Sequence, residues 1–309
     1  MFLERATCAA AIAAFARPGA AAGRMFVSLN GSLTRGVGWP EKARLAAKLG
    51  FVASRPAVFA GPKSQSTPPK ALFAELKILP TIVGLPMARP LPFGGEPAAF
   101  QQALAQLGDD AAFAAGAGCR KMMLVLSPTS ALPKDEQRKL VRDRLAAISE
   151  VLQRANVRLG LEFLGPMVFR TGRAGAPPPN PFIWTLSETL ALAKDSGASI
   201  GVVLDVWHWH HSGSTIADIL AADSSRIVHI HVSDAKAQAP EDVRDNQRVM
   251  PGEGIIDLVG FFQALQKIGY EGGVSPEPLG RIPAEMSAED GARLGLETTL
   301  AVMKKAGVI

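Results

Sequence analysis

Several features that would place this chain in a specialised class are missing from its sequence. The 309 residues include two cysteines, Cys8 and Cys119, which are too few for a disulfide framework and form no CxxC pair for structural zinc. No apolar run reaches the roughly 20 residues that span a bilayer, and no GxGxxG motif follows an apolar strand. We therefore expect neither a disulfide scaffold, nor a membrane protein, nor a dinucleotide-binding fold. Cys119 is expected to be a small buried apolar residue.

Blocks of like charge are also missing. The net charge is +5, and the lysines and arginines are scattered, often beside acidic residues as in the stretch 134–144. A surface that binds nucleic acid or membrane would need a concentrated basic patch. We therefore expect a solvated, mildly basic surface and a small-molecule partner, with neither nucleic acid nor membrane bound. Association into a homo-oligomer is left open.

The remaining composition and its periodicity indicate the fold. Apolar residues make up 48% of the chain and charged residues 20%, which is typical of a globular protein. Apolar runs alternate with helical patterns, which predicts a parallel sheet. Eight such units in this length predict a (β/α)8 TIM barrel, a single domain over residues 24–309. Strands are expected at 25–29, 51–57, 79–85, 121–126, 157–163, 200–206, 226–232 and 273–277, and helices at 40–49, 100–115, 135–155, 185–196, 257–268 and 288–305. A doubly wound open sheet is the alternative.

Residues 1–23 are interpreted as an N-terminal extension. An Ala-rich stretch follows Arg5, and small residues follow at 19–23. This order loosely follows an export signal, but a helix that leads into the barrel fits the same residues. We expect a cytoplasmic protein, with export through this segment as the alternative.

Each of the last four predicted strands ends in a polar residue that can bind a metal ion. These residues are Glu162, Asp205, His231 and Glu277. An ionisable group at the end of an apolar strand must be paired or must coordinate a metal to offset its desolvation. The carboxyl ends of all strands meet at one face of a closed barrel. The sequence therefore predicts one metal site there.

The chemistry of these four donors favours a hard divalent cation. Three carboxylates and one imidazole suit Mn²⁺, Mg²⁺ or Co²⁺ better than a thiolate-rich set would, and Zn²⁺ stays an option. We expect one ion per chain, with Mn²⁺ first among the candidates. Three carboxylates on a divalent ion leave a formal charge of −1, and open positions would admit two neighbouring substrate oxygens.

Histidines gather close to this site. His208 lies three residues after Asp205, at the start of the predicted loop, and can reach the same pocket. For His210 and His211, a position on the rim explains the residue as well as a function does. His229 lies two residues before His231, so it points to the same side of the strand, one layer deeper.

Arg248 is the last residue that the pattern singles out. It precedes the turn Pro251-Gly252, which would aim its side chain into the mouth of the barrel. There a rigid guanidinium can bind a substrate oxygen. A surface arginine before a turn is the alternative reading.

Together these residues resemble the xylose isomerase-like TIM-barrel superfamily of sugar isomerases and epimerases, and especially its D-tagatose 3-epimerase-like branch. The matching segments are Leu161-Glu162-Phe163, Asp205-x-x-His208, His229-x-His231, Arg248-x-x-Pro251-Gly252 and Glu277-Pro278. They cover residues 157–279, and the resemblance before them is architectural.

The resemblance implies roles for six residues. Glu162, Asp205, His231 and Glu277 would be the four metal ligands, and Glu162 and Glu277 would also be the two catalytic acid/base groups. His208 and Arg248 would bind substrate oxygens. The implied activity is sugar isomerisation or epimerisation by proton transfer, through an enediolate that the metal stabilises.

Two other functions fit the same residues. Because enolate formation beside a keto group also permits elimination, a lyase that releases the aglycone from a 3-keto glycoside is the alternative. The long irregular stretches at 58–70, 165–182 and 234–254 would suit such a bulkier substrate. A phosphodiesterase that resembles endonuclease IV is the third hypothesis, and it would need several zinc ions and further ligands such as His210 and His211.

Overall fold

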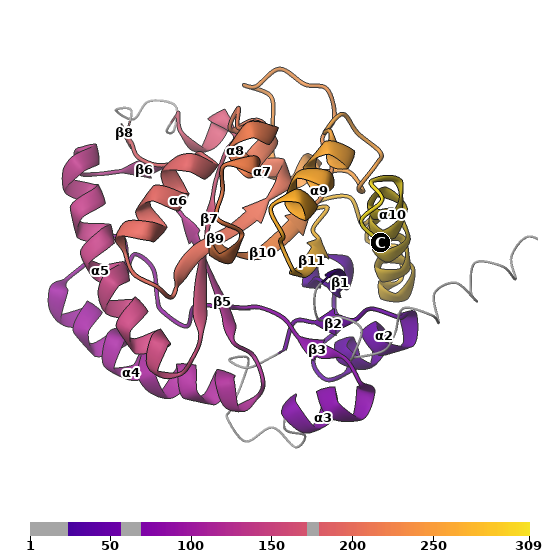
Figure 1. Ribbon diagram of the computed structural model, residues 1–309, viewed down its shortest axis with the longest axis horizontal. Helices are drawn as coiled ribbons and strands as arrows, with labels where there is room; N and C mark the ends of the chain where they lie inside the picture. Colours follow the sequence, from indigo (N-terminus) through magenta and orange to yellow (C-terminus); the bar gives the residue numbers. More distant parts are fainter. Residues whose placement is uncertain (1–23, 57–68, 172–178) are drawn as a thin grey trace, which may run out of the picture.

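The computed structural model describes residues 24–56, 69–171 and 179–309 (Figure 1). The predicted extension at 1–23, including Cys8, lies outside the described residues. So do parts of two predicted irregular stretches, at 57–68 and 172–178. No helix among the described residues combines the length and apolar character needed to cross a membrane.

A curved sheet of parallel strands forms the centre of the molecule. Its strands, in the order in which they pair, are β3 (Leu79–Pro80), β2 (Ala53–Ser54), β1 (Met25–Leu29), β11 (Gly272–Pro276), β10 (Ile227–Val232), β9 (Ile200–Asp205), β7 (Arg158–Phe163), β5 (Lys121–Leu126) and β4 (Val83–Gly84). Each neighbouring pair in this order is parallel.

The two outer strands of this order are parts of one segment. Only Thr81 and Ile82 separate β3, which pairs with β2, from β4, which pairs with β5. Counted as one, β3 and β4 make the eighth strand, and the chain itself closes the ring. The single strand predicted at 79–85 is therefore divided between its two neighbours, and the predicted barrel is confirmed.

Helices cover the outside of the barrel (Figure 1). They are α2 (Glu41–Leu49), α3 (Pro69–Leu76), α4 (Pro97–Gly116), α5 (Lys134–Arg154), α6 (Leu186–Asp195), α8 (Ile216–Leu220), α9 (Leu258–Lys267) and α10 (Ala288–Lys305). A short helix, α7 (Val206–His211), directly follows the carboxyl end of β9. Short 3-10 turns are η2 (Gly31–Leu33), η3 (Met167–Phe169), η4 (Ser224–Arg226) and η5 (Asp245–Gln247), and β6 (Thr129–Ser130) pairs antiparallel with β8 (Asn180–Pro181). The prediction missed α3, α7 and α8.

The hydrophobic core has an outer and an inner part. Two large clusters of buried residues lie between the sheet and the helices, and Cys119 belongs to one of them, as expected. A small third cluster contains Ile82, Val203 and Val228, with Met123 against it. Strands β7 and β9 carry glycines beside this cluster. A Cβ on Gly160 would lie 2.7 Å from Cγ2 of Val203, so these glycines leave room for the valines.

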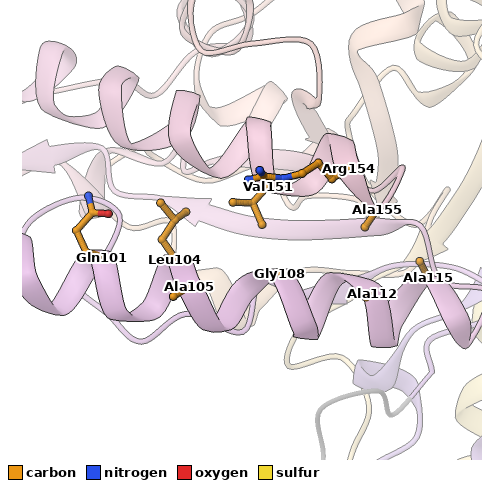
Figure 2. A pocket seen from close by; sticks show the side chains of 9 residues that line it. All are labelled: Gln101, Leu104, Ala105, Gly108, Ala112, Ala115, Val151, Arg154 and Ala155. Carbon is orange, nitrogen blue, oxygen red and sulfur yellow. The ribbon is translucent and has the colours of Figure 1, made fainter.

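A groove on the outer wall lies between α4 and α5 (Figure 2). It has a volume of about 530 Å³, and small or apolar residues line most of it. Arg154 is its one charged residue, so the groove holds no set of groups for acid/base or metal chemistry.

Adding a methyl group to the interior of the barrel is expected to be costly. In Gly201→Ala, the new Cβ would collide with the backbone oxygen of Arg226 and lie 2.9 Å from Cγ2 of Val228. Overpacking of this kind lowers the free energy of unfolding by about 1–3 kcal/mol. Urea denaturation followed by circular dichroism measures the change.

Gly108→Ala is the matched control. Gly108 is in the middle of α4, where a Cβ would have its nearest contact, with Cγ1 of Val151, at 4.0 Å. We expect this variant to keep or raise the free energy of unfolding, by up to about 1 kcal/mol from helix propensity. Equal losses in both variants would contradict the account of the barrel interior.

Candidate metal centre

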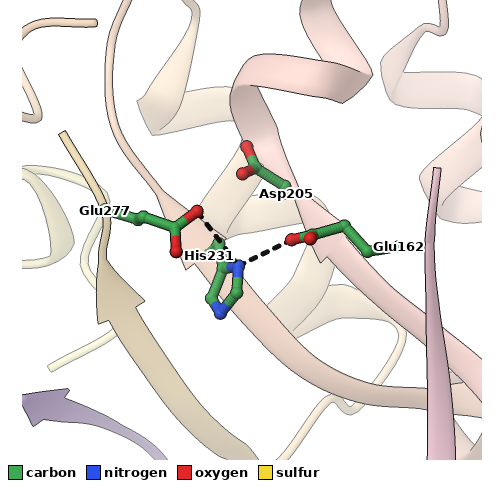
Figure 3. A group of neighbouring side chains, drawn as sticks. All are labelled: Glu162, Asp205, His231 and Glu277. Carbon is green, nitrogen blue, oxygen red and sulfur yellow. Dashed lines mark hydrogen bonds and ion pairs between the residues drawn. The ribbon is translucent and has the colours of Figure 1, made fainter. Parts of the chain in front are cut away.

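Four side chains meet at the carboxyl end of the barrel (Figure 3). Glu162, Asp205, His231 and Glu277 each offer one ligand atom, and these atoms all lie within 4.8 Å of one another. Glu162 and Glu277 approach from opposite sides, with Asp205 and His231 between them. The four residues that the strand ends single out in the sequence are thus brought together.

Strand register explains why they meet. His231 stands opposite Asp205 where β10 pairs with β9, and Glu162 stands opposite Val203 where β7 pairs with β9. Glu277 follows the last residue of β11, and its backbone N–H donates to the oxygen of Val232 at 2.8 Å. Because parallel strands place their carboxyl ends at one edge, residues far apart in sequence share one layer.

His231 lies between two carboxylates. Its Nδ1 is 2.7 Å from Oε1 of Glu162 and 3.4 Å from Oε2 of Glu277. Burial opposes a charge on this ring, but Glu277, Glu162 and Asp205 together outweigh it and raise the pKa of His231 to about 9. Burial also raises the pKa of Glu277, which His231 and Arg248 counteract. The cluster thus favours a positive charge at its centre.

Asp205 is held on both of its oxygens. Oδ1 accepts the backbone N–H groups of Trp207 and His208, which caps the start of α7. Oδ2 accepts Nη1 of Arg248 at 2.7 Å. Although burial opposes its charge, Arg248, His208 and His231 hold the pKa of Asp205 well below its usual range. The carboxylate is therefore ionised and has a fixed orientation.

Arg248 is buried beside the cluster, with 3% of its surface exposed. Its guanidinium pairs with Asp205, lies 3.4 Å from Oε2 of Glu277, and donates from Nη2 to Oδ1 of Asp245 at 2.6 Å. It also stacks on the ring of Trp207, with its carbon 4.6 Å from the ring centroid. The structure places Arg248 beside the cluster, where its charged contacts are to carboxylates. Binding of a substrate oxygen stays a prediction.

His208 lies in α7, so the prediction that it starts a loop is wrong. Nη2 of Arg248 lies 3.3 Å from Nε2 of His208, and the arginine is the donor, so Nδ1 carries the hydrogen of the neutral ring. Burial lowers the pKa of His208, although Asp205 opposes this. Nδ1 is buried without a partner among the described residues. A neutral donor thus stays free beside the cluster, which suits the role in substrate binding that the resemblance implies.

His229 lies deeper in the barrel, as the alternation along the strand predicts. Its ring centroid is 5.5 Å from that of His231, and its Nε2 is 2.8 Å from Oγ of Ser275. Burial, with the charge of His231, lowers the pKa of His229 well below its usual value. His229 therefore supports the metal layer from below as a neutral ring.

Three residues that support the candidate site were not singled out in the sequence analysis. Asn30 donates from Nδ2 to Oε1 of Glu277 at 3.1 Å. Asp245 holds Arg248, as described above. Asp234 accepts the backbone N–H groups of Gly252, Gly254 and Ile256 at 2.9 to 3.1 Å, which ties down the segment that follows Arg248. Asn30 and Asp234 follow strands β1 and β10 closely, so the strand-end rule that found the four ligands could have found them as well.

The donor set fits a divalent cation. The three carboxylates would leave a divalent ion with a formal charge of −1, and Arg248 supplies the missing positive charge through Asp205 and Glu277. A divalent ion held by these donors would replace the proton that His231 holds between the two glutamates. The described residues form one such cluster of His, Cys, Asp and Glu, and it includes neither His210 nor His211.

The family follows from a comparison with known proteins. Residues 44–301 match the model of the xylose isomerase-like TIM barrel family. The chain belongs to this family. The match covers most of the barrel, including all four candidate ligands and Arg248.

The similarity to individual relatives is low and covers only part of the chain. The chain is 30% identical over 173 residues to the inosose isomerase of Halalkalibacterium halodurans, across 56% of this chain and 57% of the relative. It is 25% identical over 166 residues to the 3-dehydro-D-guloside 4-epimerase of Escherichia coli, across 52% of this chain and 53% of the relative. The match therefore spans little more than half the length of these relatives.

A solved structure of the IOLI protein, with a bound zinc atom, shares the fold. It superposes with a TM-score of 0.74 at 23% identity, over 91% of this chain and 99% of that protein. This similarity supports the barrel from β1 to α10, which the pairing of the strands shows independently.

Removing one ligand charge is expected to weaken metal binding. Asp205→Asn keeps the size of the side chain but removes a carboxylate that lies within 4.8 Å of the other three donors. We expect wild-type protein to bind one Mn²⁺ per chain in a calorimetric titration. The variant should bind at least about tenfold more weakly, because even residues that only orient metal ligands contribute this much.

Asp109→Asn is the control for a loss of charge alone. Asp109 is exposed on α4, away from the cluster. Its metal affinity should equal that of the wild type. If both variants bind as tightly as the wild type, or if the wild type binds no divalent ion, the candidate centre is not a metal site.

Proposed function

We propose that this chain is a divalent-metal-dependent isomerase or epimerase of a small keto sugar or cyclic keto polyol. One observation carries the proposal: two glutamates, the buried Glu162 and the half-buried Glu277, face one another across a cluster that suits a cation (Figure 3). A reaction that removes a proton from one face of a carbon and returns one to the opposite face needs two such groups.

The proposed roles follow from the positions of the side chains. A cation held by Glu162, Asp205, His231 and Glu277 would supply a Lewis acid for the negative charge that develops on the substrate oxygens. One glutamate removes the proton from the carbon beside the carbonyl group, which leaves an enediolate. If the other glutamate returns a proton to the opposite face of the same carbon, the centre is epimerised. If the proton returns to the neighbouring carbon instead, and the hydroxyl proton moves to the former carbonyl oxygen, an aldose and a ketose are interchanged.

Neighbouring residues would prepare these two groups. Asn30 and Arg248 contact the two oxygens of Glu277, which orients its carboxylate. His208, neutral and with a free Nδ1–H, is a donor for a substrate hydroxyl or carbonyl oxygen. Arg248 would balance the negative charge of the cluster in every state of the reaction, because its guanidinium cannot lose its proton in the working range of pH.

The substrate class rests on the relatives. The name of the Halalkalibacterium halodurans protein refers to an inosose, a cyclic keto polyol, and that of the Escherichia coli protein refers to a 3-dehydro-guloside. Both names describe a keto group beside a carbon that carries hydrogen and hydroxyl. Mn²⁺ is proposed as the metal because the donors are mainly carboxylate oxygens, and Zn²⁺, which the IOLI structure contains, is the main competitor.

A lyase that acts on 3-keto glycosides is the second candidate. Its first step would be the same removal of a proton, followed by loss of the group on the β-carbon. The name of the 3-dehydro-D-guloside epimerase favours keto glycosides as compounds that a relative of this chain accepts. Release of a free aglycone would distinguish this reaction from epimerisation.

The proposed reaction predicts exchange of hydrogen with the solvent. The protein is loaded with Mn²⁺ and incubated in D₂O with an inosose, with free ketohexoses and with a 3-keto glucoside, and products are followed by NMR. We expect deuterium at the carbon beside the carbonyl group, together with the epimer or isomer. Glu162→Gln and Glu277→Gln should each reduce the rate by about 100-fold or more, since each removes an acid/base group.

Two controls accompany this experiment. Glu150→Gln removes an exposed carboxylate on α5 and should leave the rate unchanged. Protein treated with a chelator should lose activity and regain it with Mn²⁺. Absence of deuterium from all of the substrates would count against both candidates, whereas release of aglycone alone would favour the lyase.

A further inference from the structure

A cavity of about 650 Å³ opens beside the candidate metal centre. Its walls come from segments that follow four strands: Arg35 after β1, Phe169 after β7, Arg244 and Asp245 after β10, and Leu279 after β11. A volume of this size is in the range of small-molecule sites. The cavity therefore lies where the part of a substrate beyond the reacting carbons would extend.

Contacts through its walls connect the cavity to the centre. Asp245 lines the cavity and accepts Nη2 and Nε of Arg248, which in turn pairs with Asp205. Phe169 lines it as well, and its ring centroid is 6.2 Å from that of His208. Leu279 is two residues after Glu277. The wall of the cavity is thus one layer of side chains away from the proposed ligands.

The charge of the cavity is positive. Arg35 and Arg244 are its cations, and Asp245 is its one acidic residue. The side-chain hydrogen bonds that Asp245 accepts come from Arg248, so its carboxylate is directed away from Arg35 and Arg244. The other lining residues are apolar or neutral. Two guanidinium groups against one carboxylate leave the wall with a net positive charge, which favours an anion.

The two arginines differ in how firmly they are held. Nη1 of Arg244 donates to the backbone oxygens of Glu241 and Val243, at 2.6 and 3.0 Å, which leaves Nη2 and Nε for a ligand. Arg35 is exposed and has no hydrogen bond or ion pair to the described part of the chain. One fixed and one adjustable guanidinium can close on the oxygens of a phosphate or carboxylate.

Backbone packing holds the Arg244 side of the cavity in place. Gly280 has a φ of +80°, and a Cβ on it would collide with the backbone oxygen of Asn246. The turn η5 therefore lies directly against the segment after β11. This close approach fixes the backbone beside Arg244 against the segment that follows Glu277. The cavity therefore accepts only substrates whose length matches this spacing.

We propose that this cavity binds a terminal anionic group of the substrate, through Arg35 and Arg244, while the keto end lies at the metal centre. The proposal rests on the proposed function and narrows its substrates to sugar acids or sugar phosphates. Phosphate and carboxylate share the chemistry that guanidinium groups recognise, so the experiment includes one probe of each kind.

The test compares three probes that differ only at carbon 6. D-Fructose, D-fructuronate and D-fructose 6-phosphate are titrated into the Mn²⁺-loaded protein by calorimetry. We expect at least one anionic probe to bind at least about tenfold more tightly than D-fructose, as charge-assisted bonds to a fixed guanidinium imply. Arg35→Gln and Arg244→Gln should each reduce this preference, and the double variant should abolish it.

Lys236→Gln is the matched control. It removes one positive charge from the same segment as Arg244, but Lys236 does not line the cavity. This variant should keep the full preference for the anionic probe. Circular dichroism checks that each variant is folded, and the affinity for Mn²⁺ checks that the centre is intact.

The outcomes separate this inference from the proposed function. Equal binding of the three probes, a preference that survives both arginine substitutions, or no binding of any probe would overturn the anionic subsite. Hydrogen exchange in D₂O would still support the function in those cases. Conversely, an arginine-dependent preference without hydrogen exchange in D₂O, either in the three probes or in the neutral substrates named above, would support the subsite and refute the enzyme activity.

Discussion

The candidate site depends on how three carboxylates, two of them buried and one half-buried, are kept close together. Glu162, Asp205 and Glu277 place their oxygens within a few ångströms of one another, and unbalanced charges at that separation would destabilise the fold. Arg248 provides a permanent positive charge and His231 provides one that can be exchanged for a metal ion. The surrounding structure serves this balance: Trp207 packs against the guanidinium, Asp245 holds its far side, and Asp234 ties down the segment behind it.

Because the barrel is closed, the side chains whose charges balance one another meet in one layer, at the carboxyl ends of the strands. The ring needs β3 and β4 to be one segment shared between two neighbours, and it needs glycines where inner valines take up the space. The ionisable groups lie beyond the apolar layer of Val203 and Val228, at the carboxyl ends of the strands. The same register that packs the interior therefore fixes which residues face one another at the top.

The strand ends could be predicted from the sequence because they depend on local pattern and on one rule of topology. Apolar runs at 121–126 and 200–205 have nearly the predicted bounds, and the four candidate ligands follow from where such runs end. Helix α7 could not be found in this way. It begins directly after β9, and the residue that caps it, Asp205, was interpreted as a metal ligand at the end of the strand. Arg248 was placed in the right region, but its partners in the cluster, Asp205 and Glu277, are 43 and 29 residues away in sequence and leave no local signal. Arg35 shows the same limit, because only the folded chain brings it near Arg244.

Chemistry and specificity are therefore located on different parts of the chain. The proposed acid/base groups lie at the ends of β7 and β11. The hydrogen bonds of the sheet fix the positions of these strand ends, so a change in the segments after the strands need not move the two groups. The proposed anionic subsite lies on those segments, which can change length and composition without disturbing the barrel. A family match over 44–301 consequently identifies the barrel and the region of the centre, while the substrate has to be inferred from residues such as Arg35 and Arg244. Because η5 is packed against Gly280, the distance between the two regions is set by the backbone, and a substrate of the wrong length could not reach both.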